Sequence, residues 1–568
     1  MPVDQKSFLS QCLIKAVTKD GKTFIEKTVY EDVAMWWFVD SDFYVFIDLL
    51  IQSAGQIESC NFSFQKKNAK KYSTGTRKNF VYKSVFAYDI FHFFSSLLSR
   101  FIINFYGKHV FSDRNKILLT DENIEWRKMK NLYTNKIKKT DLFFDSILSL
   151  LVKNGKNEIV GIYPLCYPVS GIRVAIDKRI NQKELIHKPL NAYWNLDTRK
   201  KTRKAKDHFL KVWDDLKSDE VFKNSLVCNK VSLFELFEEE LSYYFTVVFY
   251  RMVGYLEMIK KMLEKEKPDL ILIKEEYGQF ERALIVEGKK RGIPTIGIQH
   301  GIPYPDIGYG IRGGRLSYLN KKAVSIDYPP IPDKTAVYGP SQKKFLVDVN
   351  FYPESSIFVT GQPRYDILCH ASRLYSREKI FDKYKIDSNK KIILWLTQCH
   401  ALTDSENYYN FNSVFEIIHS LKDVNLIIKQ HPNEPQKYSK MLKKIVINYN
   451  INITIAPKDS DTYELLFVCD LAITKNSTVA VEAVILNKPL ILINFGKEID
   501  NNNYVNEGIA IGVYKKEDFL PAVEKLLKGD AELNKNRQKF IEKFLFKNDG
   551  KSTERVVDLI YKTIKENK

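Results

Sequence analysis

The chain has 568 residues, of which 44% are hydrophobic and only 24 are glycine and 19 proline, so a collagen-like, low-complexity or disordered protein is excluded. Lysine and arginine outnumber aspartate and glutamate by 88 to 69, which gives a formal net charge of +19. This excess favours an anionic partner such as nucleic acid, acidic lipid or a phosphorylated substrate, unless it only marks a solvated basic surface. The length predicts two or three domains.

The cysteines and the N-terminal sequence predict a cytoplasmic protein. The seven cysteines are scattered, and no two of them have the spacing of a metal site or a redox motif. Such cysteines in a lysine-rich chain indicate reduced thiols. The N-terminal sequence MPVDQKSFLSQC lacks the basic and then apolar pattern of a secretory signal.

Residues 1–110 are predicted to form a mostly helical, aromatic-rich N-terminal extension. It contains an apolar stretch at 36–51, a basic stretch at 66–78 and an aromatic stretch at 80–106. Charged and polar residues interrupt the aromatic stretch, so it does not make a span of the roughly 20 apolar residues that a bilayer needs. An aromatic amphipathic helix beside basic residues suits a peripheral position on the inner face of the cell membrane. The alternative is a core helix that follows a solvated loop.

Alternating strands and helices predict a first Rossmann-like domain over residues 111–365. Helices are expected near 142–152, 232–266 and 279–290. Such alternation implies a parallel sheet with right-handed crossovers. The expected strands are 115–120, 158–163, 270–274, 293–299, 335–338 and 357–360.

A second series of strands predicts another Rossmann-like domain over residues 366–535. A helix at 536–568 is expected to pack back on the first domain. Two doubly wound domains in tandem place their ligands between them, at the carboxyl ends of the strands. The expected strands of the second domain are 392–397, 425–430, 452–456, 471–474 and 490–495.

Two histidines follow strands that are expected to end at this cleft. His300 lies in the motif QHG of the first domain, and His431 lies in KQHP of the second. Histidine can transfer a proton near neutral pH or bind phosphate. Each histidine can instead be a hydrogen-bonded structural residue.

The segment KNSTVAVE at 475–482 predicts an anion site. Ser477 and Thr478 follow a strand and begin a helix, where free N–H groups and the helix dipole attract phosphate. Glu482 lies one turn further along and can bond an uncharged group such as a ribose hydroxyl. Phosphate and ribose together indicate a nucleotide. The alternative is that Ser477 only caps a buried helix.

Further candidates flank these motifs. Glu275 and Glu276 end the strand beside His300. One of them, with Glu276 favoured, is expected to orient the imidazole or act as a base. The other is expected to lie in a solvated turn. Arg364 lies near the hinge that is expected between the two domains, where it either reaches a phosphate on the other side or pairs with Asp366. The carboxylate pairs at 40–42 and 459–461 are expected to be structural, so neither a metal nor a cofactor is predicted.

Together these motifs and the two-domain layout resemble GT-B-fold glycosyltransferases of the bacterial surface-polysaccharide group. That group includes capsule transferases, polysialyltransferases and CDP-glycerol glycerophosphotransferases, and KNSTVAVEAVILNKPLI carries much of the likeness. VTGQPRYDIL is similar to the end of the first domain in UDP-GlcNAc 2-epimerases, which share the fold. The resemblance is good over about residues 260–500 and weak before residue 111.

The resemblance implies an α/β fold whose two Rossmann-like domains face each other across a cleft. It also implies that His300 is the catalytic base towards the acceptor and that Glu482 binds the donor ribose. His431, Ser477 and Thr478 would bind the donor phosphates, with Lys475 beside them, and the reaction would need no metal. Glycerophosphotransferases typically have Asp at the position of Glu482, so the chain looks more like a sugar transferase.

The predicted function is transfer of a sugar or sugar-like group from a nucleotide-activated donor to a hydroxyl of a surface-polysaccharide or lipid-linked glycan acceptor. An anionic membrane surface is a further expected partner. The alternatives are a nucleotide-sugar 2-epimerase and a non-catalytic nucleotide-sugar-binding or scaffold protein. Nucleic acid is not expected, because the basic residues are dispersed and no known reader motif is present.

Overall fold

The structure is a computed structural model of the chain. The basic stretch at 66–78 lies outside the residues that it describes, as do all residues from 48 to 84. The described residues are 5–40, 42–43, 46–47, 85–106, 114–121, 126–164, 176–178, 180–181, 185–228, 231–301, 329–399, 402–421, 423–432, 434–447, 453–475, 477–495 and 503–568.

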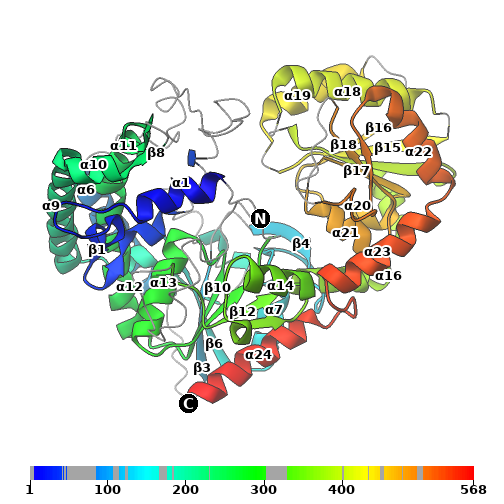
Figure 1. Cartoon of the computed structure of the whole chain (residues 1–568). Coiled ribbons are helices and arrows are strands. Elements are labelled where there is room, and N and C mark those ends of the chain that lie inside the picture. Colours follow the sequence, from blue (N-terminus) through cyan, green and yellow to red (C-terminus); the bar gives the residue numbers. More distant parts are fainter. Residues whose placement is uncertain are drawn as a thin grey trace.

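The first domain contains a parallel seven-stranded sheet in the order β13-β12-β11-β10-β3-β6-β7 (Figure 1). Most strand residues are buried, because helices cover both faces of the sheet. The strand order reverses between β3 and β10, and such a reversal is where doubly wound sheets bind ligands. The strands are β3 (Asn115–Thr120), β6 (Asn157–Tyr163), β7 (Ile186–Pro189), β10 (Leu270–Lys274), β11 (Thr295–Ile298), β12 (Lys334–Val337) and β13 (Ile357–Val359).

The second domain contains a parallel six-stranded sheet in the order β16-β15-β14-β17-β18-β19. Its order reverses between β14 and β17. The predicted α/β fold of two Rossmann-like domains is therefore confirmed. The strands are β14 (Lys391–Leu396), β15 (Val424–Lys429), β16 (Ile453–Ala456), β17 (Leu471–Thr474), β18 (Leu490–Ile493) and β19 (Ile511–Val513).

Helices of the second domain pack on both faces of its sheet and form two separate cores. Helix α21 follows the central strand β17 directly, so it begins at the carboxyl end of the sheet, where the strand order reverses. The helices in these two cores include α17 (Arg377–Tyr384), α18 (Asp404–His419), α19 (Gln436–Val446), α20 (Thr462–Val468), α21 (Val479–Ile485), α22 (Phe519–Lys528) and α23 (Ala531–Phe544).

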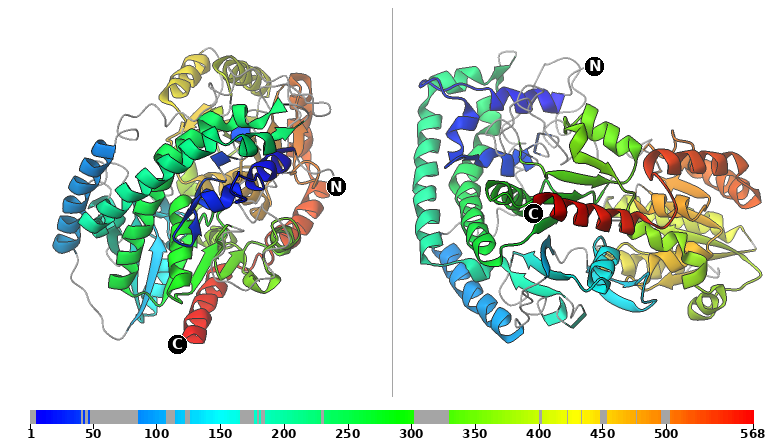
Figure 2. Two further views of the ribbon diagram at one scale, coloured as in Figure 1. Left: turned by 60° about the vertical axis from the view of Figure 1, so that its left-hand side comes forward. Right: turned by 90° about the horizontal axis from the view of Figure 1, so that it is seen from below.

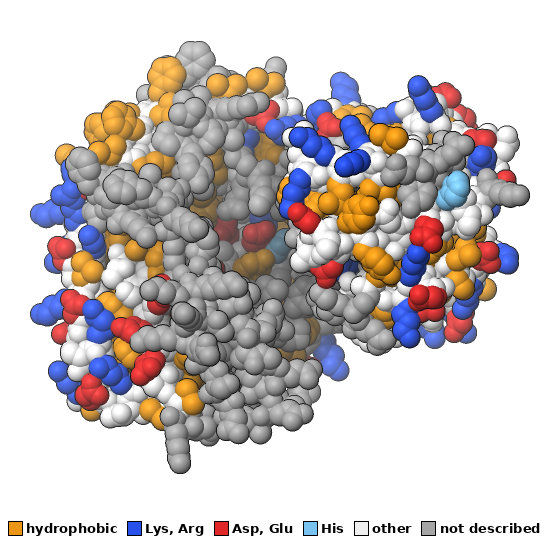
Figure 3. Space-filling model, turned by 90° about the horizontal axis from the view of Figure 1, so that it is seen from above, with side chains coloured by type: hydrophobic (Ala, Val, Ile, Leu, Met, Phe, Trp, Pro, Cys, Tyr) orange, Lys and Arg blue, Asp and Glu red, His pale blue; other side chains and the backbone are white. Residues whose placement is uncertain are grey.

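The last helix, α24 (Ser552–Asn567), returns to the first domain and packs on its sheet beside α7 (Asp145–Lys153) (Figure 2). The Asp366 carboxylate fixes the start of α24, because it accepts hydrogen bonds from the backbone N–H groups of Ser552 (3.0 Å) and Thr553 (2.7 Å). The chain thus crosses between the domains twice, and the two domains face each other across a hollow (Figure 3).

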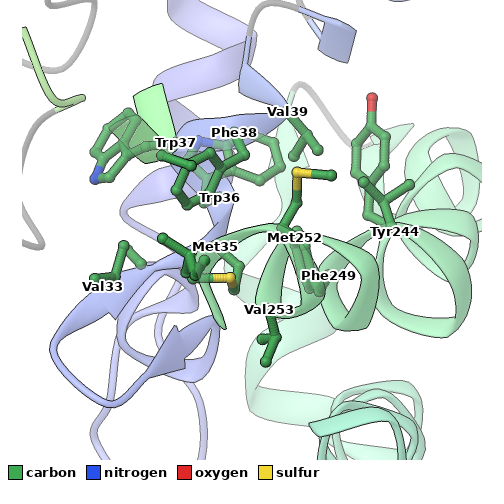
Figure 4. Close-up of a cluster of buried hydrophobic side chains, with 14 of the residues drawn as sticks. Val33, Met35, Trp36, Trp37, Phe38, Val39, Tyr244, Phe249, Met252 and Val253 are labelled. Atoms are coloured by element: carbon green, nitrogen blue, oxygen red, sulfur yellow. The ribbon is translucent and has the colours of Figure 1, made fainter. Parts of the chain in front are cut away.

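The N-terminal segment packs on the opposite face of the first sheet. The turn of helix Met35–Phe38 is fully buried against α12 (Phe249–Glu266) (Figure 4). The same core includes α9 (Leu196–Ser218), α11 (Leu233–Tyr243) and α13 (Gln279–Lys290). The apolar, aromatic sequence around the two tryptophans is therefore a core-forming segment of the first domain.

A two-stranded hairpin, β4 (Trp126–Lys130) with β5 (Ile137–Asp141), extends from the first domain to the second. The Lys128 Nζ lies 2.9 Å from the Asp459 carboxylate across the domain boundary. The Lys130 Nζ donates to the Leu374 carbonyl at 2.5 Å. Sequence patterns do not predict this hairpin, because its strands are rich in charged residues.

Helix α6 (Val85–Tyr106) is the described part of the predicted aromatic stretch and lies at the periphery of the first domain (Figure 2). Its Asp89 carboxylate pairs with Arg199 and Arg203 of α9, at 3.0 and 2.5 Å. Among the described residues no helix is both long and apolar enough to cross a bilayer.

Candidate functional site

A cavity of about 670 Å³ lies between the two domains, at the carboxyl ends of both sheets. This volume is in the range of small-molecule sites. Figure 3 shows the hollow between the domains, with acidic side chains at its floor. Residues that follow β14 and β17, such as Thr397 and Ser477, line the cavity, so it opens at the reversal point of the second sheet.

His300 lines the first-domain side of the cavity, just after β11. Its Nε2 lies 3.2 Å from the Tyr277 hydroxyl and 3.4 Å from the Glu275 carboxylate. Burial lowers the pKa of His300 to about 4, with further lowering by the charges of Arg364 and Lys274. The imidazole is therefore neutral at neutral pH and can accept a proton.

The two glutamates after β10 have different surroundings. Glu276 is buried, and its carboxylate accepts hydrogen bonds from the hydroxyls of Tyr352 and Thr335. Burial raises the pKa of Glu276 to about 7. Glu276 is not among the described residues that line the cavity. The structure thus brings Glu275 to His300, and Glu276 is held within the first domain.

The backbone of Glu275 is also unusual. Its φ of 54° lies in the left-handed region, which is uncommon for residues other than glycine. Glu275 is the first residue after β10, which ends at Lys274. Of the two glutamates, Glu275 is the one that lies close enough to form an ion pair with the imidazole, with 3.4 Å between its Oε1 and Nε2 of His300.

On the opposite side of the cavity lie His431, Ser477 and Thr478. The Ser477 hydroxyl accepts a hydrogen bond from the Val479 N–H at 3.3 Å. Thr478 occupies the N-cap position of α21, but its side chain makes no capping hydrogen bond. Lys475 is described but does not line the cavity. The cavity therefore contains both histidines and both hydroxyl residues that the sequence singles out.

Arg364 and Glu482 also line the cavity and form an ion pair, with 3.0 Å between Nη2 and Oε1. Both side chains are buried. The guanidinium lies over the rings of Phe143 and Tyr365, at 5.2 and 4.7 Å from their centroids. The predicted alternative, a pair of Arg364 with Asp366, is not formed: Arg364 pairs with Glu482, and Asp366 accepts hydrogen bonds from the start of α24.

Lys429 is a cavity residue that sequence reasoning did not single out, although it stands in the motif KQHP. It is buried, and its ammonium donates to the carbonyls of Gln430 (3.1 Å) and Lys458 (2.7 Å). Burial lowers the pKa of Lys429 to about 8, and the charge of Arg127 lowers it further. Among the described residues no carboxylate lies within hydrogen-bonding distance of this ammonium, and an anion would stabilise its charge.

Two buried hydroxyls on the second-domain side also lack partners among the described residues. The Thr474 Oγ1 and the Tyr463 hydroxyl both belong to residues that line the cavity. A buried hydroxyl without a partner is costly. A ligand with several oxygens would satisfy them, so the wall beside β17 is suited to a polar ligand.

In the described part of the chain, no group of three or more His, Cys, Asp or Glu side chains is arranged to hold a metal ion. Asp459 pairs with Lys128, and Asp461 caps α20 through the Tyr463 N–H at 2.9 Å. Asp40 pairs with Arg282. These carboxylates have protein partners, as expected for structural residues.

Two Rossmann-like domains that face each other across such a cavity define the GT-B fold. The family model described as "CDP-Glycerol:Poly(glycerophosphate) glycerophosphotransferase" matches residues 271–562. The chain belongs to this family. The match includes the strand end beside His300, the hinge with Arg364 and the whole second domain.

Individual relatives are more distant. The chain is 27% identical over 223 residues to a teichoic acid poly(ribitol-phosphate) polymerase of Bacillus spizizenii, covering 36% of this chain and 33% of the relative. It is 24% identical over 287 residues to a processive diacylglycerol beta-glucosyltransferase of Bacillus licheniformis, covering 49% and 66%. The chain thus spans from a third to just under two thirds of these relatives.

The chain is also similar to solved structures at low sequence identity. UDP-GlcNAc 2-epimerase from Neisseria meningitidis is 14% identical, with a TM-score of 0.46 and coverage of 79% of this chain and 100% of the epimerase. The wall teichoic acid polymerase TagF is 14% identical, with a TM-score of 0.44 and coverage of 89% and 99%.

Proposed function

We propose that the protein transfers glycerophosphate from CDP-glycerol to a hydroxyl of a cell-surface polymer. The observation that carries this proposal is that one cavity has a candidate base on one side and several phosphate-binding groups on the other. His300, neutral and able to accept a proton, lies on the first-domain side, and His431, Ser477, Thr478 and Lys429 lie opposite it. Family membership supplies the class of donor.

The donor lies on the second domain. Its phosphates bind His431, the hydroxyls of Ser477 and Thr478, and the ammonium of Lys429. Lys475 contributes only its charge, since it does not line the cavity. Because Arg364 holds one oxygen of Glu482, the other carboxylate oxygen is oriented to accept a hydrogen bond from a ribose hydroxyl.

The acceptor hydroxyl enters from the first domain, and His300 removes its proton. The acceptor oxygen forms a bond to the glycerol-bearing phosphorus, and the bond from that phosphorus to the bridging oxygen breaks. CMP leaves with the electron pair of that bond. The cations and hydroxyls of the second domain stabilise the charge that develops on the leaving phosphate, and such preorganised stabilisation is commonly the largest catalytic effect. Glu275 orients His300.

Sugar transfer is the second candidate, and Glu482 is the residue that favours it. A glutamate here is longer than the aspartate typical of glycerophosphotransferases, and a glucosyltransferase is among the relatives. In that reaction the acceptor attacks the anomeric carbon and a nucleoside diphosphate leaves. The nucleotide product therefore distinguishes the two reactions.

The test is to incubate the protein with CDP-glycerol, with and without a lipid-linked glycerophosphate polymer, and to identify the nucleotide released. We expect CMP to be released only when the acceptor is present. Parallel reactions with UDP-glucose and UDP-GlcNAc test the other candidates. Release of UDP would establish a sugar transferase, conversion of UDP-GlcNAc without acceptor would establish an epimerase, and intact donors throughout would indicate a non-catalytic protein.

We also propose that α6 lies against an anionic membrane surface, where such an acceptor would be held. Five large apolar residues, each 40–65% exposed, follow the helical spacing of one face: Ile90, Phe93, Phe94, Leu97 and Phe101. Helix α9 (Leu196–Ser218), which is joined to α6 through Asp89, carries the basic sequence RKKTRK at residues 199–204. An apolar stripe beside basic residues is typical of interfacial helices.

Sedimentation with lipid vesicles tests this placement. We expect binding to vesicles that contain phosphatidylglycerol and little binding to vesicles of phosphatidylcholine alone. The double variant F94S/F101S should lose the binding, whereas I447S, which removes an exposed apolar side chain from the second domain, should keep it. Equal sedimentation of all three proteins would refute the role of α6.

A further inference from the structure

Six lysine and arginine side chains line the cavity, and within the described part of the chain one of them differs from the rest. Five already make ion pairs or hydrogen bonds with the protein. Arg127 makes neither. The engaged residues are Lys128 with Asp459, Lys139 with Asp177, Arg364 with Glu482, Lys429 with two carbonyls, and Lys458 with the Glu434 carbonyl.

Arg127 is held in place by its neighbours on β4. The hairpin ladder pairs it with Thr140 of β5. The Trp126 indole N–H donates to the buried Asp121 carboxylate at 3.0 Å, and Lys128 bonds to Asp459 of the second domain at 2.9 Å. The side chains of the two neighbours of Arg127 thus contact one domain each. Its partly buried side chain is presented to the cavity from the first domain.

The charge of Arg127 acts on residues of the other domain. Burial lowers the pKa of Lys429, and Arg127 is the next cause of that lowering. Burial raises the pKa of Glu482, and Arg127 opposes this increase together with Arg364. Both effects require Arg127 to lie within a short electrostatic range of these two residues. The guanidinium is therefore close to the donor side of the cavity.

We propose that Arg127 binds a phosphate of the nucleotide donor, so that the first domain contributes a cation to the donor site. This inference rests on the proposed function in that it takes the donor to be a nucleoside diphosphate compound. The planar guanidinium can bond two phosphate oxygens at once. The guanidinium contacts the donor from the first domain, opposite Ser477 of the second domain. The bound donor then connects the two domains.

This assignment replaces the one that the sequence suggested for Arg364. Arg364 is also a cavity arginine, but its buried guanidinium already neutralises Glu482 and stacks on two aromatic rings. Moving it to a phosphate would leave the Glu482 carboxylate buried without its cation, which is costly. Arg127 can bind a phosphate without breaking any ion pair among the described residues.

The test is isothermal titration calorimetry of the full chain with CDP, UDP, pyrophosphate and cytidine. The variants are R127A, R127K and the control K136A, which removes the same charge from an exposed position of the same hairpin outside the cavity. We expect R127A to weaken binding of the diphosphates by about 10- to 100-fold, as the loss of a charge-assisted hydrogen bond implies. Cytidine binding should be unchanged, R127K should restore part of the affinity, and K136A should match the wild type.

Several results would overturn the inference. One is diphosphate binding by R127A that equals wild type; another is an equal loss for cytidine, which would indicate a structural role. Unchanged nucleotide affinity with an increased KM for a phosphate-bearing acceptor would assign Arg127 to the acceptor instead. Failure of the wild type to bind CDP, UDP or pyrophosphate would remove the site altogether. Binding of UDP but not CDP would contradict only the proposed donor, and the effect of R127A would then be measured with UDP.

Discussion

Arg364 and Glu482 form a buried ion pair between the segment that ends the first domain and the helix that begins beside the donor wall of the second, with 3.0 Å between Nη2 and Oε1. Neither side chain is more than 9% exposed. Arg364 thus determines where the Glu482 carboxylate lies. Both residues also line the cavity. The pair therefore links the segment that connects the two domains to the proposed ribose site.

Removal of one member of this pair is predicted to destabilise the protein strongly. The variant E482Q leaves a buried guanidinium without its carboxylate, and we expect the free energy of unfolding to fall by about 3 kcal/mol or more. The control is E416Q, which breaks the exposed pair with Lys516 and should change stability by less than about 1 kcal/mol. Chemical denaturation measures both, and equal effects of the two variants would show that the buried pair contributes little.

Nucleotide affinity is predicted to depend on pH through Lys429. Burial lowers the pKa of its ammonium to about 8 in the free protein, so the cation is present below that pH and is lost above it. CDP binding should therefore be strongest below about pH 8 and weaken progressively at higher pH. The variant K429M should bind weakly at every pH. A wild-type affinity for CDP that stays constant up to about pH 10 would contradict the role of Lys429.

Glu276 is predicted to affect stability and not turnover. Its folded-state pKa of about 7 exceeds the ordinary value of 4.5, so the folded protein retains this proton where the unfolded chain has lost it. Its contribution to stability must then decrease as pH increases from about 4.5 to about 7. E276Q should gain stability relative to wild type over that range while transferring substrate at a rate close to wild type. A large loss of turnover with unchanged stability would restore Glu276 as a catalytic residue.

The parallel strands were predictable because they are buried on both faces and form short apolar runs, as in β15 and β17. Hairpin β4–β5 was not, since its segments WRKMK and IKKTD contain charged residues that face the cavity or pair across the domain boundary. No local pattern marks such a hairpin. Strands β7 and β19 were also missed; they are short and lie at the edges of their sheets.

Some residues of the site could also be predicted from the sequence, and others could not. His300 and His431 could be singled out because strand ends in doubly wound sheets meet the ligand. The choice between Glu275 and Glu276 depends on their contacts with distant residues, and two adjacent glutamates look alike in sequence. The partner of Arg364 is 118 residues away in the chain, and Arg127 stands on an unpredicted element. Both depend on how the two domains pack.

The measurement that tests the central claim most directly is transfer by H300A, compared with its donor affinity. If the cavity is the active site and His300 is the base, kcat should fall by about 100- to 10,000-fold, as expected for loss of a general base. The affinity for CDP should remain close to that of the wild type, because His300 lies opposite the donor wall. On the acid side, the wild-type kcat/KM should begin to decline only as pH approaches the low His300 pKa of about 4. Undiminished turnover by H300A would contradict the account.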